Sequence, residues 1–163
     1  MNIILCGFMG SGKTVVGSEL AKIMGRKFVD TDELIEEEQG VAIKAIFATH
    51  GEDYFRELEF EMCKKIGAEC KNCIVSTGGG AMTFERNVEA IKNGGKIVFL
   101  DADFDTICER IGNSNNRPLF QDREKAKALY DERKSKYLKA SDYVIDGNMS
   151  ARKTALEIAQ IFR

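Results

Sequence analysis

Short runs of apolar residues alternate along the chain with longer segments in which apolar positions recur every three or four residues. The short runs are "NIIL", "KFV", "CIVS", "KIVFL" and "DYVI", at 2–5, 27–29, 73–76, 96–100 and 142–145. Runs of this length, rich in Ile and Val, are typical of buried strands, and the longer segments between them are typical of helices. Because strands joined by helical crossovers form parallel sheets, the pattern predicts an α/β fold with a five-stranded parallel sheet and helices on both faces.

The first predicted strand leads directly into "GFMGSGKT", residues 7–14, which fits the phosphate-binding pattern GxxxxGK[ST]. In such a loop the glycines let backbone N–H groups point at a polyphosphate, and the following helix turns its positive end toward it. We expect Lys13 to reach the outer phosphates and the Thr14 hydroxyl to bind Mg²⁺. A glycine turn with an incidental lysine is the alternative. The segment after the loop predicts a helix, in which four apolar residues can share one face: Val15, Leu20, Ile23 and Met24.

Two acidic residues follow the second predicted strand in "DTD", Asp30 to Asp32. Ligands of open α/β sheets bind at the carboxyl ends of the strands, so one carboxylate can face a metal there and the other a substrate hydroxyl. The alternative for either residue is to cap the helix "TDELIEEE", a role for which Asp is well suited. Asp101 competes for the metal side, because "KIVFLDAD" is also an apolar strand that ends in a carboxylate.

Three consecutive glycines, 78–80, follow the third predicted strand in "STGGGAM". Each glycine costs backbone entropy, so stability does not explain the run. Close approach of the main chain to a ligand does explain it, and a plain turn is the alternative.

Arg56 lies near the start of a predicted helix in "GEDYFRELE". The side chain can bind a ligand, but it can equally pair with Glu52 or Glu59 on a solvated helix face, since residues three or four apart on a helix are neighbours. The sequence around Arg56 leaves these alternatives open.

Residues 112–122, "GNSNNRPLFQD", form a polar insert that holds Pro118, the only proline of the chain. Such an insert is typical of a mobile loop or lid. Arg110 lies two residues before the insert, Arg117 lies inside it, and Arg133 lies on the helix that follows. Taken singly, each arginine is more typical of a surface charge than of a ligand.

The charge of the chain restricts its partners. Its 163 residues include 24 basic and 26 acidic ones, a formal charge of -2, so no strongly basic face is implied and nucleic acid is not expected as a partner. No run approaches the roughly 18 apolar residues of a membrane span, and no signal peptide precedes the first predicted strand. We expect a cytoplasmic protein with small-molecule substrates and no membrane partner.

Five cysteines suit a reducing compartment, and "CKNC" at Cys70 to Cys73 has the spacing of a metal or redox motif. A zinc site would need two more ligands, but there is no second CxxC and His50 is the only histidine. We therefore interpret the pair as structurally inert.

Taken together and in order, six motifs resemble the shikimate kinase family over essentially the whole chain. They are GxxGxGK[ST] at the start, DxD near residue 30, "GE..FR..E" near 55, "GGG" near 79, "RPL" in the insert and "R...Y" near 135. The resemblance implies transfer of the γ-phosphoryl group of ATP to the 3-hydroxyl of shikimate, in aromatic amino-acid biosynthesis. It also implies a three-layer P-loop kinase fold, in which residues 1–163 form a single domain. A shikimate-binding region is expected at about 31–60 and a lid at about 112–122.

The resemblance also assigns roles to residues. Expected at the ATP site are Gly10, Ser11, Gly12, Lys13, Thr14, Val15, Arg110 and Arg117. Expected at the shikimate site are Asp32, Arg56, Gly78, Gly79 and Arg133, with Phe47 and Phe55 as walls and Glu59 bracing Arg56. The expected catalytic residues are Lys13, Asp32 and Arg117. One Mg²⁺ ion per active site is expected on Thr14 and Asp30. The stretch "DGNMSARK" lacks a proline that some family members carry beside the adenine, so the contacts of that loop are open.

Two alternative functions compete with this one. Another small P-loop kinase could act on gluconate or a nucleoside monophosphate, but paired arginines with "DTD" and "GGG" favour a carboxylated ring. A nucleotide-binding switch would show an apolar patch for a partner protein, and none is recognisable. We expect a monomer that binds ATP and shikimate.

Overall fold

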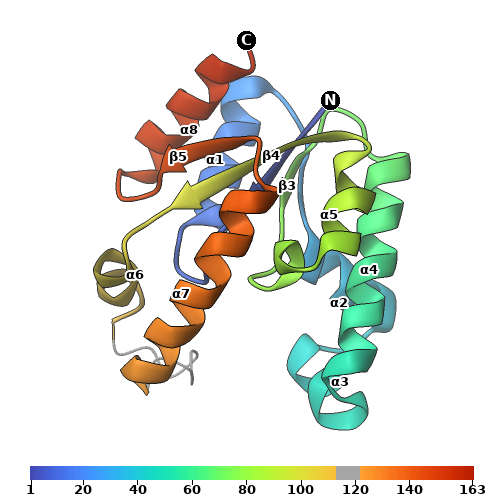
Figure 1. The fold of residues 1–163 in the computed structure, drawn as a ribbon. Coiled ribbons are helices and arrows are strands. Elements are labelled where there is room, and N and C mark those ends of the chain that lie inside the picture. Colours follow the sequence, from blue (N-terminus) through green and yellow to red (C-terminus); the bar gives the residue numbers. More distant parts are fainter. Residues whose placement is uncertain (113–121) are drawn as a thin grey trace.

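A computed structural model of the chain describes residues 1–112 and 122–163 and contains a five-stranded sheet in the order β2-β3-β1-β4-β5 (Figure 1). All neighbouring strands are parallel. The strands are β1 (Asn2–Cys6), β2 (Phe28–Asp30), β3 (Ile74–Ser76), β4 (Gly95–Asp101) and β5 (Tyr143–Asp146). The predicted α/β fold with five parallel strands is therefore confirmed.

Helices cover both faces of this sheet. They are α1 (Lys13–Met24), α2 (Thr31–Gln39), α3 (Ile43–His50), α4 (Glu52–Glu69), α5 (Glu85–Lys92), α6 (Phe104–Ile111), α7 (Arg123–Ala140) and α8 (Ala151–Ile161), with a short 3₁₀ helix η1 (Ala81–Thr83). Helices α1 and α8 pack together on one face, whereas α4, α5 and α7 lie on the other (Figure 1). None of the helices in the described ranges combines the length and the apolar character that crossing a membrane requires.

The central strand β1 lies between two layers of helices, and this position accounts for its continuous apolar run. Ile3 and Leu5 join the core under α1 and α8, whereas Ile4 and Cys6 join the core under the opposite helices. Because side chains of a strand alternate between the two faces, a strand covered on both sides is apolar along its buried stretch, here Ile3 to Cys6, and the buried Asn2 before it is satisfied by hydrogen bonds.

The buried face of α1 differs from the expected one. Val16, Gly17, Leu20 and Ala21 are buried, whereas Val15 is 58% exposed. Val15 precedes Leu20 by five positions, and at 3.6 residues per turn this places it on another side of the helix. Ile23 and Met24 are partly buried against the same core.

Three loops gather at the carboxyl edge of the sheet because the strands that precede them are in register. Leu5 of β1 and Asp30 of β2 are both aligned with Ser76 of β3. The segment after β1 is the phosphate loop, the segment after β2 is "DTD", and the segment after β3 carries the three glycines. The edge that binds ligands in open parallel sheets therefore holds the predicted site residues.

The "CKNC" segment forms the turn from α4 into β3. The Asn2 side chain donates to the Cys70 carbonyl oxygen (3.0 Å) and accepts from the Cys73 backbone N–H (2.9 Å). All five cysteines are free thiols. Among the described residues, no group of three or more His, Cys, Asp or Glu side chains is placed to hold a metal ion.

The contact between α4 and α5 gives a test of the packing. We expect Gly67→Ala to lower the free energy of unfolding by about 1–3 kcal/mol, because the added methyl group would overlap the Ala90 carbonyl oxygen. At an unhindered helical position the same change raises stability by about 1 kcal/mol, through helix propensity. Chemical denaturation measures the effect, and Ala68→Gly at the exposed neighbouring position isolates the propensity contribution. A higher denaturation midpoint for Gly67→Ala would contradict the prediction.

Candidate active site

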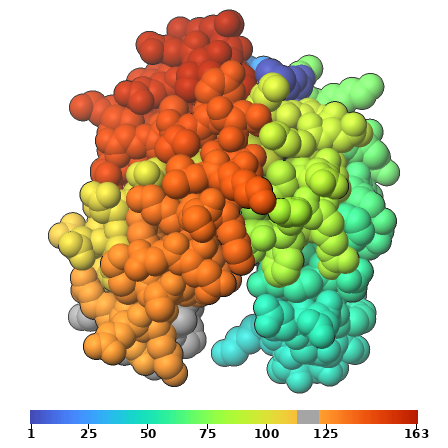
Figure 2. Space-filling model, in the orientation of Figure 1, coloured from blue at the N-terminus to red at the C-terminus, as the bar shows by residue number. Residues whose placement is uncertain are grey.

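A cavity of about 550 Å³ lies at the carboxyl edge of the sheet. Its lining comes from the phosphate loop and the start of α1, from the segments after β2 and β3, and from the loop between β5 and α8. The lining residues include 9–16, Asp30, Asp32, 76–79, Arg110, Gly147 and 149–151. Figure 2 shows the molecule hollowed between α7, in orange, and α3, in cyan. Sequence segments that are far apart therefore share one solvent-accessible space.

The phosphate loop has the geometry that its sequence predicts. Gly12 is the N-cap of α1 with φ +97°, a left-handed conformation that glycine adopts without strain. Lys13 lies folded onto the loop, where its Nζ donates to the carbonyl oxygens of Gly7 (2.7 Å) and Phe8 (3.2 Å). The buried Ser11 hydroxyl has no hydrogen-bond partner among the described residues. An exposed helix N-terminus, a lysine and a hydroxyl are the groups that recognise phosphate.

Asp30 and Asp32 both line the cavity, but they are held differently. Asp30 is the N-cap of α2, and its Oδ1 accepts from the backbone N–H groups of Asp32 (2.9 Å) and Glu33 (3.1 Å). The expected alternative, a capping role, therefore applies to Asp30, and it leaves the second oxygen, Oδ2, outside the cap.

Asp32 is the more unusual carboxylate. Its buried Oδ1 has no hydrogen-bond partner among the described residues. Burial, followed by the charges of Asp30 and Glu59, raises the pKa of Asp32 to about 6. A buried acceptor without a partner costs free energy, so a ligand that donates a hydroxyl group would relieve it.

The two candidates for the metal-side carboxylate are separated by their positions. Asp30 lines the cavity together with Thr14, whereas Asp101 is not among the lining residues. Asp101 instead pairs with Lys134 on α7 (Oδ1 to Nζ, 3.5 Å). Of the two candidates, Asp30 is therefore the one that shares the cavity with Thr14.

The glycine segment brings main chain against charged side chains. A Cβ on Gly78 would lie 2.6 Å from Asp32 Oδ1, and one on Gly80 would lie 2.9 Å from both Nη atoms of Arg56. Gly79 lies beside Arg133, whose Nη1 would be 3.6 Å from an added Cβ. The glycines therefore do more than turn the chain, because side chains at 78 and 80 would displace Asp32 and Arg56.

Hydrogen bonds hold this glycine segment in place. The Gly78 backbone N–H donates to Thr31 Oγ1 (3.0 Å), and the Thr83 hydroxyl donates to the Gly80 carbonyl oxygen (2.6 Å). The Tyr137 hydroxyl donates to the Gly79 carbonyl oxygen from α7. The segment is thereby attached to α2, η1 and α7.

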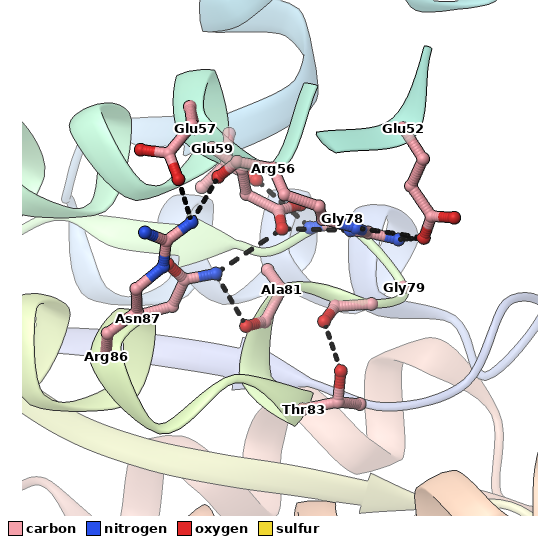
Figure 3. A network of polar contacts seen from close by, with 12 residues as sticks. Glu52, Arg56, Glu57, Glu59, Gly78, Gly79, Ala81, Thr83, Arg86 and Asn87 are labelled. Carbon is pink, nitrogen blue, oxygen red and sulfur yellow. Dashed lines mark hydrogen bonds and ion pairs between the residues drawn. The ribbon is translucent and has the colours of Figure 1, made fainter. Parts of the chain in front are cut away.

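Arg56 makes both of the ion pairs considered from sequence, yet it does not lie on a solvated face. Its Nη1 donates to Glu59 Oε1 at 2.9 Å, and its Nε lies 3.5 Å from Glu52 Oε1 (Figure 3). The Arg56 side chain is only 16% exposed and packs on the rings of Phe55 and Phe84. Glu59 is therefore a buried brace, as expected.

The remaining arginines occupy different places. Arg110 donates to the carbonyl oxygens of Ser11 (3.2 Å), Gly147 (2.6 Å) and Met149 (3.2 Å), and so ties the phosphate loop to the loop between β5 and α8. Arg133 extends from α7 toward Gly79. The expected lid arginine, Arg117, lies outside the described residues, as does most of the expected lid.

Phe47 and Phe55 are in contact, with ring centroids 4.9 Å apart. Phe55 is buried, whereas Phe47 of α3 is exposed. The contacts of "DGNMSARK" were open from sequence, and in the structure Gly147 and residues 149–151 of this stretch line the cavity. The available signal was topological, since this loop also follows a parallel strand at the carboxyl edge.

The comparisons with known proteins point to one family. The family model described as Shikimate kinase matches residues 9–163. A shikimate kinase of Helicobacter hepaticus is 43% identical over 161 residues, which cover 98% of this chain and 94% of that protein. One of Moorella thermoacetica is 40% identical over 164 residues, covering 99% and 94%.

Solved structures agree with this result. The structure of shikimate kinase from Acinetobacter baumannii in complex with shikimate superposes with a TM-score of 0.90 at 36% identity, covering 99% of this chain and 92% of that one. The structure from Aquifex aeolicus gives 0.84 at 35% identity, covering 99% and 96%. The chain therefore belongs to the shikimate kinase family, and it is an ATP-dependent phosphotransferase.

Proposed function

We propose that the protein transfers the γ-phosphoryl group of ATP to the 3-hydroxyl of shikimate, giving shikimate 3-phosphate and ADP in aromatic amino-acid biosynthesis. The observation that carries this proposal is the glycine segment 78–80, where Asp32, Arg56 and Arg133 converge beside the phosphate loop. Shikimate is an anionic ring with three hydroxyl groups, so it requires both guanidinium groups and a hydrogen-bond acceptor.

The phosphate loop and Arg110 form the donor side. Residues 10–15 would hold the β- and γ-phosphates with backbone N–H groups, and Lys13 would exchange its loop carbonyl partners for outer phosphate oxygens. Arg110 holds the loop of Gly147 and Met149 against the phosphate loop, which shapes the place for adenine.

Thr14 and Asp30 fit one Mg²⁺ ion. A hydroxyl and a free carboxylate oxygen at one cavity wall suit a hard cation that takes its other ligands from phosphates and water. When bound, the ion neutralises charge that develops on the transferring phosphoryl group. Asp30 would bind the ion through Oδ2, while its Oδ1 keeps the cap of α2.

The acceptor side positions one hydroxyl in line with the γ-phosphate. Arg56 and Arg133 hold the shikimate carboxylate, and the main chain of Gly78 and Gly79 contacts the ring. Asp32 Oδ1, a buried acceptor, receives the hydroxyl hydrogen bond and orients the attacking oxygen. Phosphoryl transfer asks mainly for positioning and charge stabilisation, and this arrangement supplies both.

Arg117 and the lid at about 112–122 remain a proposal from sequence. A lysine, a cation and a lid arginine would together meet charge on the equatorial oxygens. We also propose a single domain with the shikimate-binding region at about 31–60, active as a monomer because one chain supplies all the side chains invoked here. Five free thiols suit the cytoplasm as its location.

An acceptor panel tests the proposal. We expect shikimate to stimulate ADP release well above the ATPase background, and quinate, gluconate and nucleoside monophosphates to do much less. Two arginines and a buried acceptor match a carboxylated polyol ring, whereas a nucleotide needs a second base pocket. Equal stimulation by gluconate or by a nucleotide would overturn the assignment.

The metal-side carboxylate is tested by Asp30→Asn against Asp101→Asn. Asparagine can keep the cap of α2, so only the charge is lost, and we expect turnover to fall roughly 100-fold or more. Asp101→Asn changes an ion pair outside the cavity and should stay within a few-fold. Steady-state rates at varied Mg²⁺ concentration measure both, and the opposite ranking would move the site to the end of β4.

The role of bare main chain at Gly80 is tested by Gly80→Ala. Its Cβ would lie 2.9 Å from Nη1 and Nη2 of Arg56, the far end of a flexible side chain, so stability should change little. We expect the KM for shikimate to rise by about tenfold, equivalent to about 1.4 kcal/mol, with the KM for ATP unchanged. An unchanged KM for shikimate would show that Arg56 need not occupy the observed position.

A further inference from the structure

We propose that Asn87 is a positioning residue of the acceptor site, which fixes the Glu59 carboxylate and, through it, the Arg56 guanidinium. The inference rests on the proposed function, since it assumes that Arg56 binds the acceptor carboxylate. Asn87 does not line the cavity, so it acts on the acceptor only through other side chains.

The contacts of Asn87 join three elements. Asn87 lies in the first turn of α5 and is 1% exposed. Its Nδ2 donates to Glu59 Oε1 on α4 (3.4 Å) and to the Ala81 carbonyl oxygen of η1 (3.0 Å) (Figure 3). Ala81 directly follows the three glycines, so one amide group holds both the brace of Arg56 and the end of the glycine segment.

The same oxygen of Glu59 serves both neighbours. Oε1 accepts from Arg56 Nη1 at 2.9 Å and from Asn87 Nδ2 at 3.4 Å. The two hydrogen bonds fix the Glu59 carboxylate from two directions. The Arg56 guanidinium lies between this carboxylate and Gly80, so the position of the carboxylate sets the direction of the guanidinium.

Charge explains why a neutral donor suits this position. Glu59 is 1% exposed, and burial raises the pKa of its carboxyl, while Arg56, Arg133 and the Asn87 hydrogen bond lower it. A buried carboxylate needs hydrogen-bond donors to stay ionised. A cation at position 87 would compete with Arg56 for Glu59, and a carboxylate would repel Glu59. The asparagine amide donates without doing either.

A role in stability alone explains Asn87 less well. Its Oδ1 is buried and has no hydrogen-bond partner among the described residues. An apolar residue of similar size would avoid that unsatisfied group, so the value of asparagine lies in the donor it offers to Glu59 and Ala81.

The test compares Asn87→Leu with the wild type, whose binding and phosphorylation of shikimate are measured first. We expect the Kd and KM for shikimate to rise by about tenfold, as for loss of one hydrogen bond to a charged group, with kcat within about twofold. The Kd for ADP should not change, because the donor side is untouched. Asn87→Ser, whose hydroxyl is too short to replace the amide, should behave in the same way if Asn87→Leu does not fold.

A double-mutant cycle with Glu59→Gln separates positioning from packing. If Asn87 acts through the Glu59 carboxylate, Glu59→Gln alone weakens shikimate binding, and adding Asn87→Leu changes the Kd by less than about twofold. Additive losses, or no loss from Glu59→Gln, would overturn the inference.

The matched control is Glu85→Gln. Glu85 also links α5 to a neighbouring helix, through an exposed ion pair with Lys139 of α7 (2.9 Å), and among the described residues no hydrogen bond or ion pair joins it to Glu59 or Arg56. We expect wild-type binding of shikimate from this variant, and a loss equal to that of Asn87→Leu would overturn the inference. If the wild type neither binds nor phosphorylates shikimate, the proposed function fails. If the wild type does both, and the Asn87 variants bind shikimate as tightly as the wild type, the proposed function stands and only this inference fails.

Discussion

The acceptor side of the cavity depends on a stretch of main chain that carries no side chains. Along Gly78, Gly79 and Gly80, the charged ends of Asp32, Arg133 and Arg56 each approach a different residue of the backbone. These three side chains come from α2, α7 and α4, which are not consecutive in sequence. A single methyl group at position 78 or 80 would move one of them, so the spacing of the charges follows from the absence of Cβ atoms.

The same region holds an unusual balance of charge. Glu59 is buried, and burial, followed by the charges of Asp30 and Glu59, raises the pKa of the Asp32 carboxyl. Arg56 offsets the charge of Glu59 by its ion pair with that carboxylate. Asp32 has no comparable partner among the described residues, which leaves it available to a ligand.

The fold could be predicted from sequence because strands covered on both faces are apolar along their buried stretch, as Ile3 to Cys6 of β1 and Ile97 to Leu100 of β4 show. The phosphate loop could be predicted because its function depends on local backbone. The residues of the proposed acceptor site were harder to predict from sequence. Arg56 has acidic neighbours at helical spacing, and this spacing is the same whether that face of the helix is solvated or buried. Glu59 gives no sign of its burial, because glutamates are usually exposed.

The choice between Asp30 and Asp101 shows a second limit. Both follow apolar strands, so local pattern treats them alike, and only the side-chain directions separate them. Asp101 meets Lys134 of α7, a helix whose position depends on packing that no local signal encodes. Asn87 is a third case: one asparagine in an amphipathic helix carries no sequence signature of the carboxylate it contacts.

Lys13 gives the phosphate loop a further property. With its Nζ on the carbonyl oxygens of Gly7 and Phe8, the lysine occupies the concave side of the loop and satisfies acceptors there. The cation therefore stabilises its own loop before any nucleotide arrives, and the loop need not refold around the phosphates. Nucleotide affinity then reflects an exchange of partners, carbonyl oxygens for phosphate oxygens, rather than the full strength of the new contacts.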